Sequence, residues 1–181
     1  MNKVLAVVGA RKPNAAQRER CQHAVRAALE VGWQIVTGGA PGIDHLAVLA
    51  AQRADRAGRV TLVLPWERFE GWQDLRLQRV VFDPGEHAGW LTEARHLHPA
   101  PQRVSRGAWL LLARDVGIAA LAALVLAFPQ GGDGGGTAFT CRAARRLGKP
   151  VYEDVGHPQG GVDYRRALEA IAAPVAATAA R

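Results

Sequence analysis

The sequence predicts an α/β fold: a Rossmann-like, open, mostly parallel sheet with helices on both faces, formed by a single domain. Two observations carry this prediction. Short β-prone apolar runs alternate with amphipathic segments of helical spacing, and glycine-rich segments follow successive apolar runs. Such alternation yields parallel strands joined by right-handed helical crossovers. A length of 181 residues, with 49% hydrophobic and 22% charged residues, suits one folded globular domain.

The first third of the chain predicts two strand–helix units and a third strand. Residues 4–8 form a continuous apolar run that ends at Gly9, which is typical of a strand buried on both faces. Asn14 is the expected N-cap of a helix over 15–31, whose apolar residues recur at helical spacing. The elements expected next are a strand over 33–37, a helix over 43–57 and a strand over 60–64.

The remainder of the chain is less regular at first and then resumes the alternation. Residues 66–102 mix aromatic, proline, histidine and arginine residues without a steady period. The elements expected in this part are a weak strand over 79–82, helices over 86–97 and 102–121, a strand over 123–128, a helix over 138–147, a strand over 151–154 and a helix over 164–171. We therefore expect one domain over 1–172, with an alanine-rich tail over 173–181 that frays.

The charge balance is compatible with a polyanionic partner. Lys and Arg exceed Asp and Glu by 23 to 16, a formal net charge of +7. Such a surplus attracts nucleic acid or other polyanions without specifying one, and Arg-rich coding is the alternative explanation.

Several classes of protein are not indicated. Cys21 and Cys141 lie far apart without CxxC spacing, so they read as buried thiols in a reducing, cytoplasmic compartment. The longest apolar run, 118–128, is shorter than the ~20 residues that span a bilayer, so no membrane association is expected. His87, His96 and His98 match no metal-ligand spacing, and we expect no metal site.

Three glycine-rich segments are the candidate binding loops. Each follows a predicted strand and precedes a predicted helix, so each can direct backbone N–H groups and a helix N-terminus at an anion. In open parallel sheets, ligands bind at the carboxyl ends of the strands, where the strand order reverses. One such loop alone is more often a tight turn that binds nothing, but three at one sheet edge favour phosphate binding. The candidate residues are Gly9, Ala10, Arg11, Thr37, Gly38, Gly39, Gly42, Asp44, Arg114, Gly134, Gly135, Gly136 and Thr137.

The polar members of this set have alternative roles. Thr137 is placed to cap its helix and to donate its hydroxyl to phosphate. Asp44 could accept from a ribose hydroxyl or simply favour the helix dipole. Arg114, which Asp115 could orient, is expected either to pair with phosphate or to be solvated. No catalytic residue is assigned, because neither Ser105 nor Cys141 has an adjacent histidine or acid to activate it.

Four short segments carry a resemblance to a known family. They read Val7-Val8-Gly9-Ala10-Arg11, then Val36-Thr37-Gly38-Gly39-Ala40-Pro41-Gly42-Ile43-Asp44, then Arg114-Asp115 with Gly117-Ile118-Ala119-Ala120-Leu121, and finally residues 134–140 with Gly148-Lys149-Pro150-Val151. In this order the chain resembles the DNA-processing protein A (DprA/Smf) family and the wider SLOG superfamily, over roughly residues 4–155. That superfamily also holds the "lonely guy" phosphoribohydrolases.

The resemblance implies a Rossmann-like sheet whose glycine-rich edge binds nucleotide or nucleic-acid phosphates. In the DprA family it implies single-stranded DNA binding and a recombinase partner. Two family arginines are absent, because Pro41 and Val116 stand at their positions. Thr140 stands where the phosphoribohydrolases have a catalytic glutamate, which disfavours hydrolysis.

Three hypotheses follow from the sequence. The leading one is a stand-alone, non-catalytic domain that binds nucleotide or single-stranded nucleic acid through phosphates, in DNA processing or recombination. A second is an N-glycosidic hydrolase of nucleoside monophosphates with Asp133 as its acid. A third is a small nucleotide-ligand sensor that works as a homodimer through the apolar helix before Ala123. No cofactor is required by these hypotheses, although a nucleotide or phosphate could be bound.

Overall fold

A computed structural model describes residues 3–72, 74–130, 135–155 and 162–173 of the chain. Its centre is a six-stranded, entirely parallel sheet with the strand order β4-β3-β2-β1-β5-β6. The strands are β1 (Val4–Gly9), β2 (Gln34–Thr37), β3 (Val60–Leu64), β4 (Gln78–Val81), β5 (Leu124–Phe128) and β6 (Val151–Glu153). The helices are α1 (Ala15–Glu30), α2 (Ile43–Arg53), α3 (Ala88–Leu97), α4 (Arg106–Leu121), α5 (Gly135–Arg146) and α6 (Val162–Ala172).

The strand order reverses at β1. The chain proceeds from β1 outward through β2, β3 and β4, and then returns across the sheet to place β5 on the other side of β1. Gly9 lies beside Phe128 in the register of this pair, so the two strands end together. The connections that leave these strands diverge, and a crevice is expected at that point.

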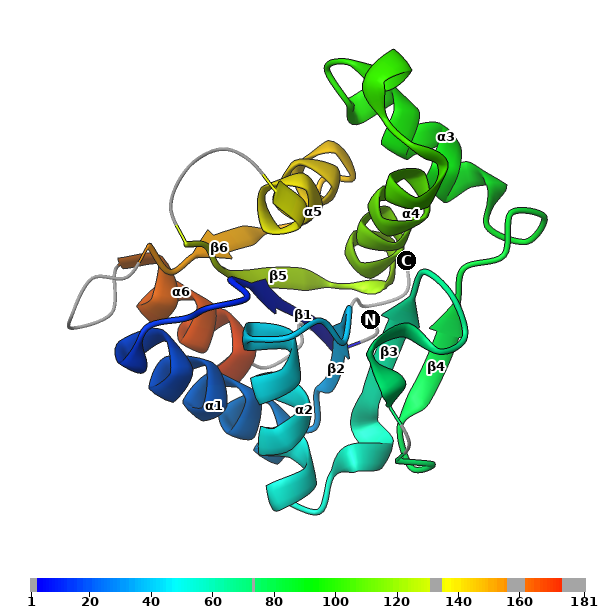
Figure 1. Cartoon of the computed structure of the whole chain (residues 1–181). Coiled ribbons are helices and arrows are strands. Elements are labelled where there is room, and N and C mark those ends of the chain that lie inside the picture. The colour runs from blue at the N-terminus through cyan, green and yellow to red at the C-terminus, as the bar shows by residue number, and fades with distance from the viewer. Residues whose placement is uncertain (1–2, 73, 131–134, 156–161, 174–181) are drawn as a thin grey trace, which may run out of the picture.

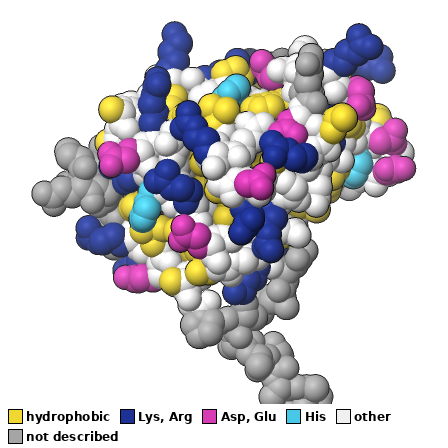
Figure 2. All heavy atoms as spheres, turned by 90° about the horizontal axis from the view of Figure 1, so that it is seen from below, with side chains coloured by type: hydrophobic (Ala, Val, Ile, Leu, Met, Phe, Trp, Pro, Cys, Tyr) yellow, Lys and Arg dark blue, Asp and Glu magenta, His cyan; other side chains and the backbone are white. Residues whose placement is uncertain are grey.

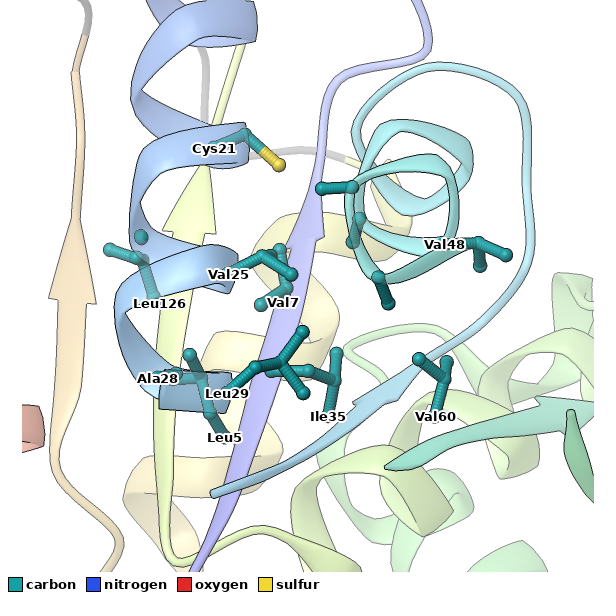
Figure 3. Close-up of a cluster of buried hydrophobic side chains, with 14 of the residues drawn as sticks. Leu5, Val7, Cys21, Val25, Ala28, Leu29, Ile35, Val48, Val60 and Leu126 are labelled. Carbon is teal, nitrogen blue, oxygen red and sulfur yellow. The ribbon is translucent and has the colours of Figure 1, made fainter. Parts of the chain in front are cut away.

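Two layers of helices cover the sheet (Figure 1): α1, α2 and α6 lie on one face, and α3, α4 and α5 lie on the other. Side chains alternate along β1, so Leu5 and Val7 face the first layer while Ala6 and Val8 face the second. In Figure 3, Val25 of α1 lies against Val7. Burial on both faces explains why each central strand reads as a continuous apolar run.

The expected fold class and element order are confirmed, and several boundaries are corrected. Helix α2 ends at Arg53 rather than at 57, because Asp55 adopts a positive φ of 53° that a helix cannot continue. Helix α4 begins at Arg106, after a short 3₁₀ turn at Pro101–Arg103, and Ser105 caps it. Asn14 caps α1 as expected, in a reciprocal pair of hydrogen bonds with Gln17.

A buried ion pair fixes the start of α1 to the end of β6. The Arg20 guanidinium bonds both carboxylate oxygens of Asp154, with Nε at 2.5 Å and Nη2 at 3.0 Å. The Gln17 amide donates to the Pro129 carbonyl at 2.8 Å, which ties the chain leaving β5 to the same helix. Because both partners of the ion pair are buried, losing either would leave an uncompensated charge.

The described residues bear on three of the compositional expectations. Both cysteines are free and buried. No described helix is long and apolar enough to cross a membrane, and no group of His, Cys, Asp or Glu in the described ranges could hold a metal ion. Viewed from the side of α1, α2 and α6, Lys and Arg side chains are interspersed with Asp and Glu (Figure 2), so this face is not uniformly basic. The alanine-rich tail lies outside the described residues from 174 onward.

Candidate phosphate-binding cleft

A cleft of about 770 Å³ opens where β1 and β5 end. It is lined by the chain that leaves β1, by α4 as far as Asp115 with the segment before this helix, and by the start of α5. Its volume lies in the range of about 300–1,000 Å³ that is usual for small-molecule sites. The crevice therefore forms at the place that the strand order predicts.

The cleft gathers eight of the predicted site residues. They are Gly9, Ala10, Arg11, Asp44, Arg114, Gly135, Gly136 and Thr137. Four others, Thr37, Gly38, Gly39 and Gly42, are not among the described residues that line it, and Gly134 lies outside the described part of the chain. The second predicted loop, with the helix start that follows it, therefore contributes Ala40 and Asp44 to the cleft.

The start of α5 is open to the cleft. Gly135 has a positive φ of 88°, and apart from the backbone of its own helix no atom of the described residues lies within 4 Å of the position that a Cβ would occupy there. The helix begins at Gly135, three residues before the expected start, so Thr137 lies in its first turn and is not the predicted cap. The free N–H groups of a helix's first turn favour an anion.

The turn between β2 and α2, residues 38–42, is filled by protein atoms instead. A Cβ on Gly38 would lie 1.6 Å from Arg114 Nη1, so the guanidinium packs directly on this glycine. Gly42 has a φ of 95°, and a Cβ there would lie 2.2 Å from the Ala10 carbonyl oxygen. Asp44 Oδ2 accepts from the N–H groups of Gly38 and Ala40, at 3.1 and 3.4 Å. These glycines allow close packing inside the protein.

Aromatic residues after β3 cover the outer side of this turn. The Trp72 indole donates to the Gly39 carbonyl at 2.8 Å, and its ring lies 4.8 Å from the His45 ring. The Phe69 ring lies 5.5 Å from the Arg114 guanidinium carbon. Phe69 and Trp72 therefore pack over a turn of the protein.

Arg114 stands between two buried carboxylates. Its Nη1 lies 3.4 Å from Asp115 Oδ1 and 3.9 Å from Asp44 Oδ2, and Arg114 is 7% exposed. Its Nε has no hydrogen-bond partner among the described residues. The sequence alternative of a solvated Arg114 is therefore wrong, because packing on Gly38 and two acids draws it inside the fold.

Burial also perturbs the two acids. It raises the pKa of Asp44 to about 6, although Arg114 and the N–H groups of Ala40 and Gly38 act in the opposite direction. Burial raises the pKa of Asp115 to about 7; Arg114 opposes this rise and the Asp44 charge adds to it. Two carboxyls that titrate near neutrality thus lie at the floor of the cleft.

Sequence reasoning missed the wall contributed by α4 and the segment before it. His98, Arg103, Ser105 and Leu111 line the cleft there, and Arg142 lines it from the second turn of α5. Residues 98–102 belong to the segment without a steady period, so the pattern gave no sign that the chain before α4 folds back over the sheet edge. The one indication in the sequence that Arg103 belongs to the site was its nearness to Ser105, the N-cap of α4.

The position of the expected phosphoribohydrolase glutamate has a structural role here. Thr140 is buried, and its hydroxyl donates to the Gly136 carbonyl one turn earlier at 3.0 Å.

The described residues of the cleft offer exposed arginines, helix N–H groups and two acids paired with Arg114. That combination can hold an anion.

Comparison with known proteins adds both a family and a fold. The sequence model for the DNA recombination-mediator protein A family matches residues 1–166. No curated protein sequence matches the chain. Among solved structures, DNA processing protein A from Helicobacter pylori, described by its single-stranded DNA binding mode, is 17% identical with a TM-score of 0.57, and the match covers 92% of this chain and 72% of that one.

Two further structures share the fold. DNA processing protein A from Streptococcus pneumoniae is 20% identical with a TM-score of 0.60, over 94% of this chain and 56% of that one. The molybdenum cofactor binding protein from Rippkaea orientalis is 18% identical with a TM-score of 0.56, over 84% of this chain and 76% of that one. At these identities the structures establish a shared fold.

Proposed function

The chain belongs to the DNA recombination-mediator protein A family, and from this premise we propose that its cleft binds nucleotide or single-stranded nucleic acid through phosphate groups. The observation that carries the proposal is the pairing of an open helix N-terminus with arginines around one cleft at the strand-order reversal. Helix N–H groups and guanidinium groups are the usual protein ligands of phosphate.

Two of these arginines are available to a ligand. Arg11 and Arg103 are exposed, line the cleft, and have no side-chain partner among the described residues. Arg114, in contrast, is already engaged by two carboxylates. Arg11 and Arg103 are therefore the side chains expected to make direct phosphate contacts.

Phosphate rather than base contacts are expected to dominate. Binding by stacking needs exposed aromatic faces, each contributing roughly 1–3 kcal/mol per base. The aromatic side chains among the described lining residues are His98 and Phe139, and Phe139 is 1% exposed. Binding led by phosphates tolerates any base sequence and weakens with salt.

Family membership supports a role in DNA processing or recombination, and the Helicobacter pylori relative is described as binding single-stranded DNA. A recombinase partner, which the resemblance implies, remains a prediction for this chain. A homodimer through the apolar helix before Ala123 also remains a prediction.

The test is fluorescence anisotropy of a labelled oligothymidylate, titrated with the protein at several salt concentrations. We expect affinity to fall steeply with salt, because binding releases counterions from the phosphates. Arg11→Ala and Arg103→Ala should each weaken binding roughly fivefold and reduce the salt slope by about 0.7.

Arg26→Ala is the matched control, since Arg26 is exposed on α1 beyond the other face of the sheet. It removes the same charge and should change affinity little. Equal losses in all three variants would indicate a general effect of net charge and would contradict a phosphate site in the cleft.

A second candidate, the small-ligand sensor, is favoured by the size of the cleft, which suits one mononucleotide. The fold shared with molybdenum cofactor binding proteins is compatible with it. Thermal-shift measurements would support the sensor if a mononucleotide stabilised the protein and oligonucleotides did not. The hydrolase stays an untested alternative, with Asp133 outside the described residues.

A further inference from the structure

Asp115 lines the cleft beside the first turn of α5. It is 5% exposed and lines the cleft, and its Oδ2 is 3.1 Å from the position of a Cβ on Gly136 in the first turn of α5. Its ion-pair partner is Arg114, at 3.4 Å. No donor among the described residues hydrogen-bonds to its carboxylate, so that carboxylate acts on the cleft mainly through its charge.

The buried cluster around Asp115 carries an excess of negative charge. Arg114 contributes one positive charge, whereas Asp115 and Asp44 contribute two negative charges when both are ionised. The other charged or titratable side chains that line the cleft are Arg11 near the end of β1, His98 and Arg103 before α4, and Arg142 on α5. Above about pH 7, where both acids are predominantly ionised, the cleft is therefore cationic around a buried cluster whose net charge is −1.

On the basis of the proposed phosphate site, we propose that Asp115 is a specificity-determining residue that favours singly charged phosphodiesters over doubly charged terminal phosphates. The arginines and the α5 N-terminus attract either anion. Asp115 repels both, and the repulsion doubles when the charge of the ligand doubles. A site with the arginines alone would prefer the terminal phosphate.

The charge difference between the two ligand classes is large near neutral pH. A terminal phosphate carries about −1.5 to −2 because its second pKa is about 6, whereas an internal phosphodiester carries −1. Burial raises the pKa of Asp115 to about 7, so both Asp115 and a terminal phosphate are predominantly ionised at pH 8. Selection should be greatest there.

The test is an NMR titration of the isotope-labelled protein at pH 8 with two probes. One probe is thymidine 5′-monophosphate, and the other is the dinucleotide thymidylyl-(3′→5′)-thymidine, which has a phosphodiester and no terminal phosphate. Asp115→Asn removes the charge and keeps the shape. We expect it to tighten binding of the monophosphate by about tenfold and of the dinucleotide by about threefold, since the repulsion scales with ligand charge.

Asp55→Asn is the matched control. Asp55 is exposed beyond the end of α2, and asparagine tolerates its positive φ, so this variant changes net charge without touching the cleft. It should leave both affinities unchanged. Asp115→Ser removes the same charge with a smaller side chain. It provides the same measurement if the asparagine side chain of Asp115→Asn disturbs Gly136.

The outcomes separate this inference from the proposed function. Binding of both probes with equal gains or no gain in Asp115→Asn and Asp115→Ser would overturn the role of Asp115 while leaving the phosphate site intact. Absence of binding by either probe to the native protein and to every variant would overturn both.

Discussion

The β2–α2 turn and the start of α5 are both rich in glycine, but they differ in what surrounds the glycines. In the β2–α2 turn, Gly38 and Gly42 make room for Arg114 and for the Ala10 carbonyl. At the start of α5, no described residue fills the space where a side chain of residue 135 would be. A glycine-rich turn lets another group come close to the backbone, but that group can belong either to the protein itself or to a ligand.

The largest effect that tests this comparison is on stability. Gly42 and Gly135 both have positive φ, at 95° and 88°, but among the described residues backbone atoms of another segment pack against Gly42 alone of the two. Gly42→Ala should lower the free energy of unfolding by about 3 kcal/mol or more, from backbone strain plus the clash with Ala10. Gly135→Ala should cost about 1 kcal/mol, from backbone strain alone.

Denaturant unfolding of both variants measures the difference directly. Similar losses at the two positions would show that the β2–α2 turn can relax, and would remove the distinction between the two turns.

An intermediate effect concerns pH, because burial has raised the pKa values of Asp44, which accepts from the β2–α2 turn, and of Asp115 on α4. The folded protein keeps protons on Asp44 and Asp115 at a pH where the unfolded chain has lost them, between about pH 4 and pH 7. Their contribution to stability is therefore complete below about pH 4 and is lost as pH rises through 7.

Thermal melting of the native protein and of Asp115→Asn, at pH 5 and pH 8, isolates this contribution. From pH 5 to pH 8, the melting temperature of the native protein should fall by about 5 °C relative to that of the variant. A difference that stays constant with pH would mean that Asp115 does not titrate in this window.

The smallest effect tests the packing of Trp72 over the β2–α2 turn. Trp72→Phe removes the indole donor to the Gly39 carbonyl while keeping an aromatic ring. The loss of one hydrogen bond should lower the free energy of unfolding by about 1 kcal/mol. Phosphate affinity, measured by anisotropy on the folded protein, should not change; a marked loss would show that this turn takes part in binding.

Hydrophobic patterning predicted the strands of the sheet, because a strand that is buried on both faces consists mainly of apolar residues. Each central strand reads as a continuous apolar run, and Asn14 with Gln17 marks the start of α1. Element ends were less predictable where one residue's backbone decided them, as Asp55 does after α2. The cleft lining before α4 was missed because residues 98–102 carry no steady period, and their place depends on long-range packing.

The sequence by itself determined the fold class, the parallel order of strand and helix, and the edge at which a ligand site would form, since local pattern and chain direction suffice for these. Only the tertiary structure decided which glycine-rich turn faces the cleft, and that Arg114 is held by Asp44 and Asp115. Those outcomes depend on side chains brought together from α2, α4 and the segment after β3. Contacts between residues so distant in the chain leave no periodic trace in the sequence.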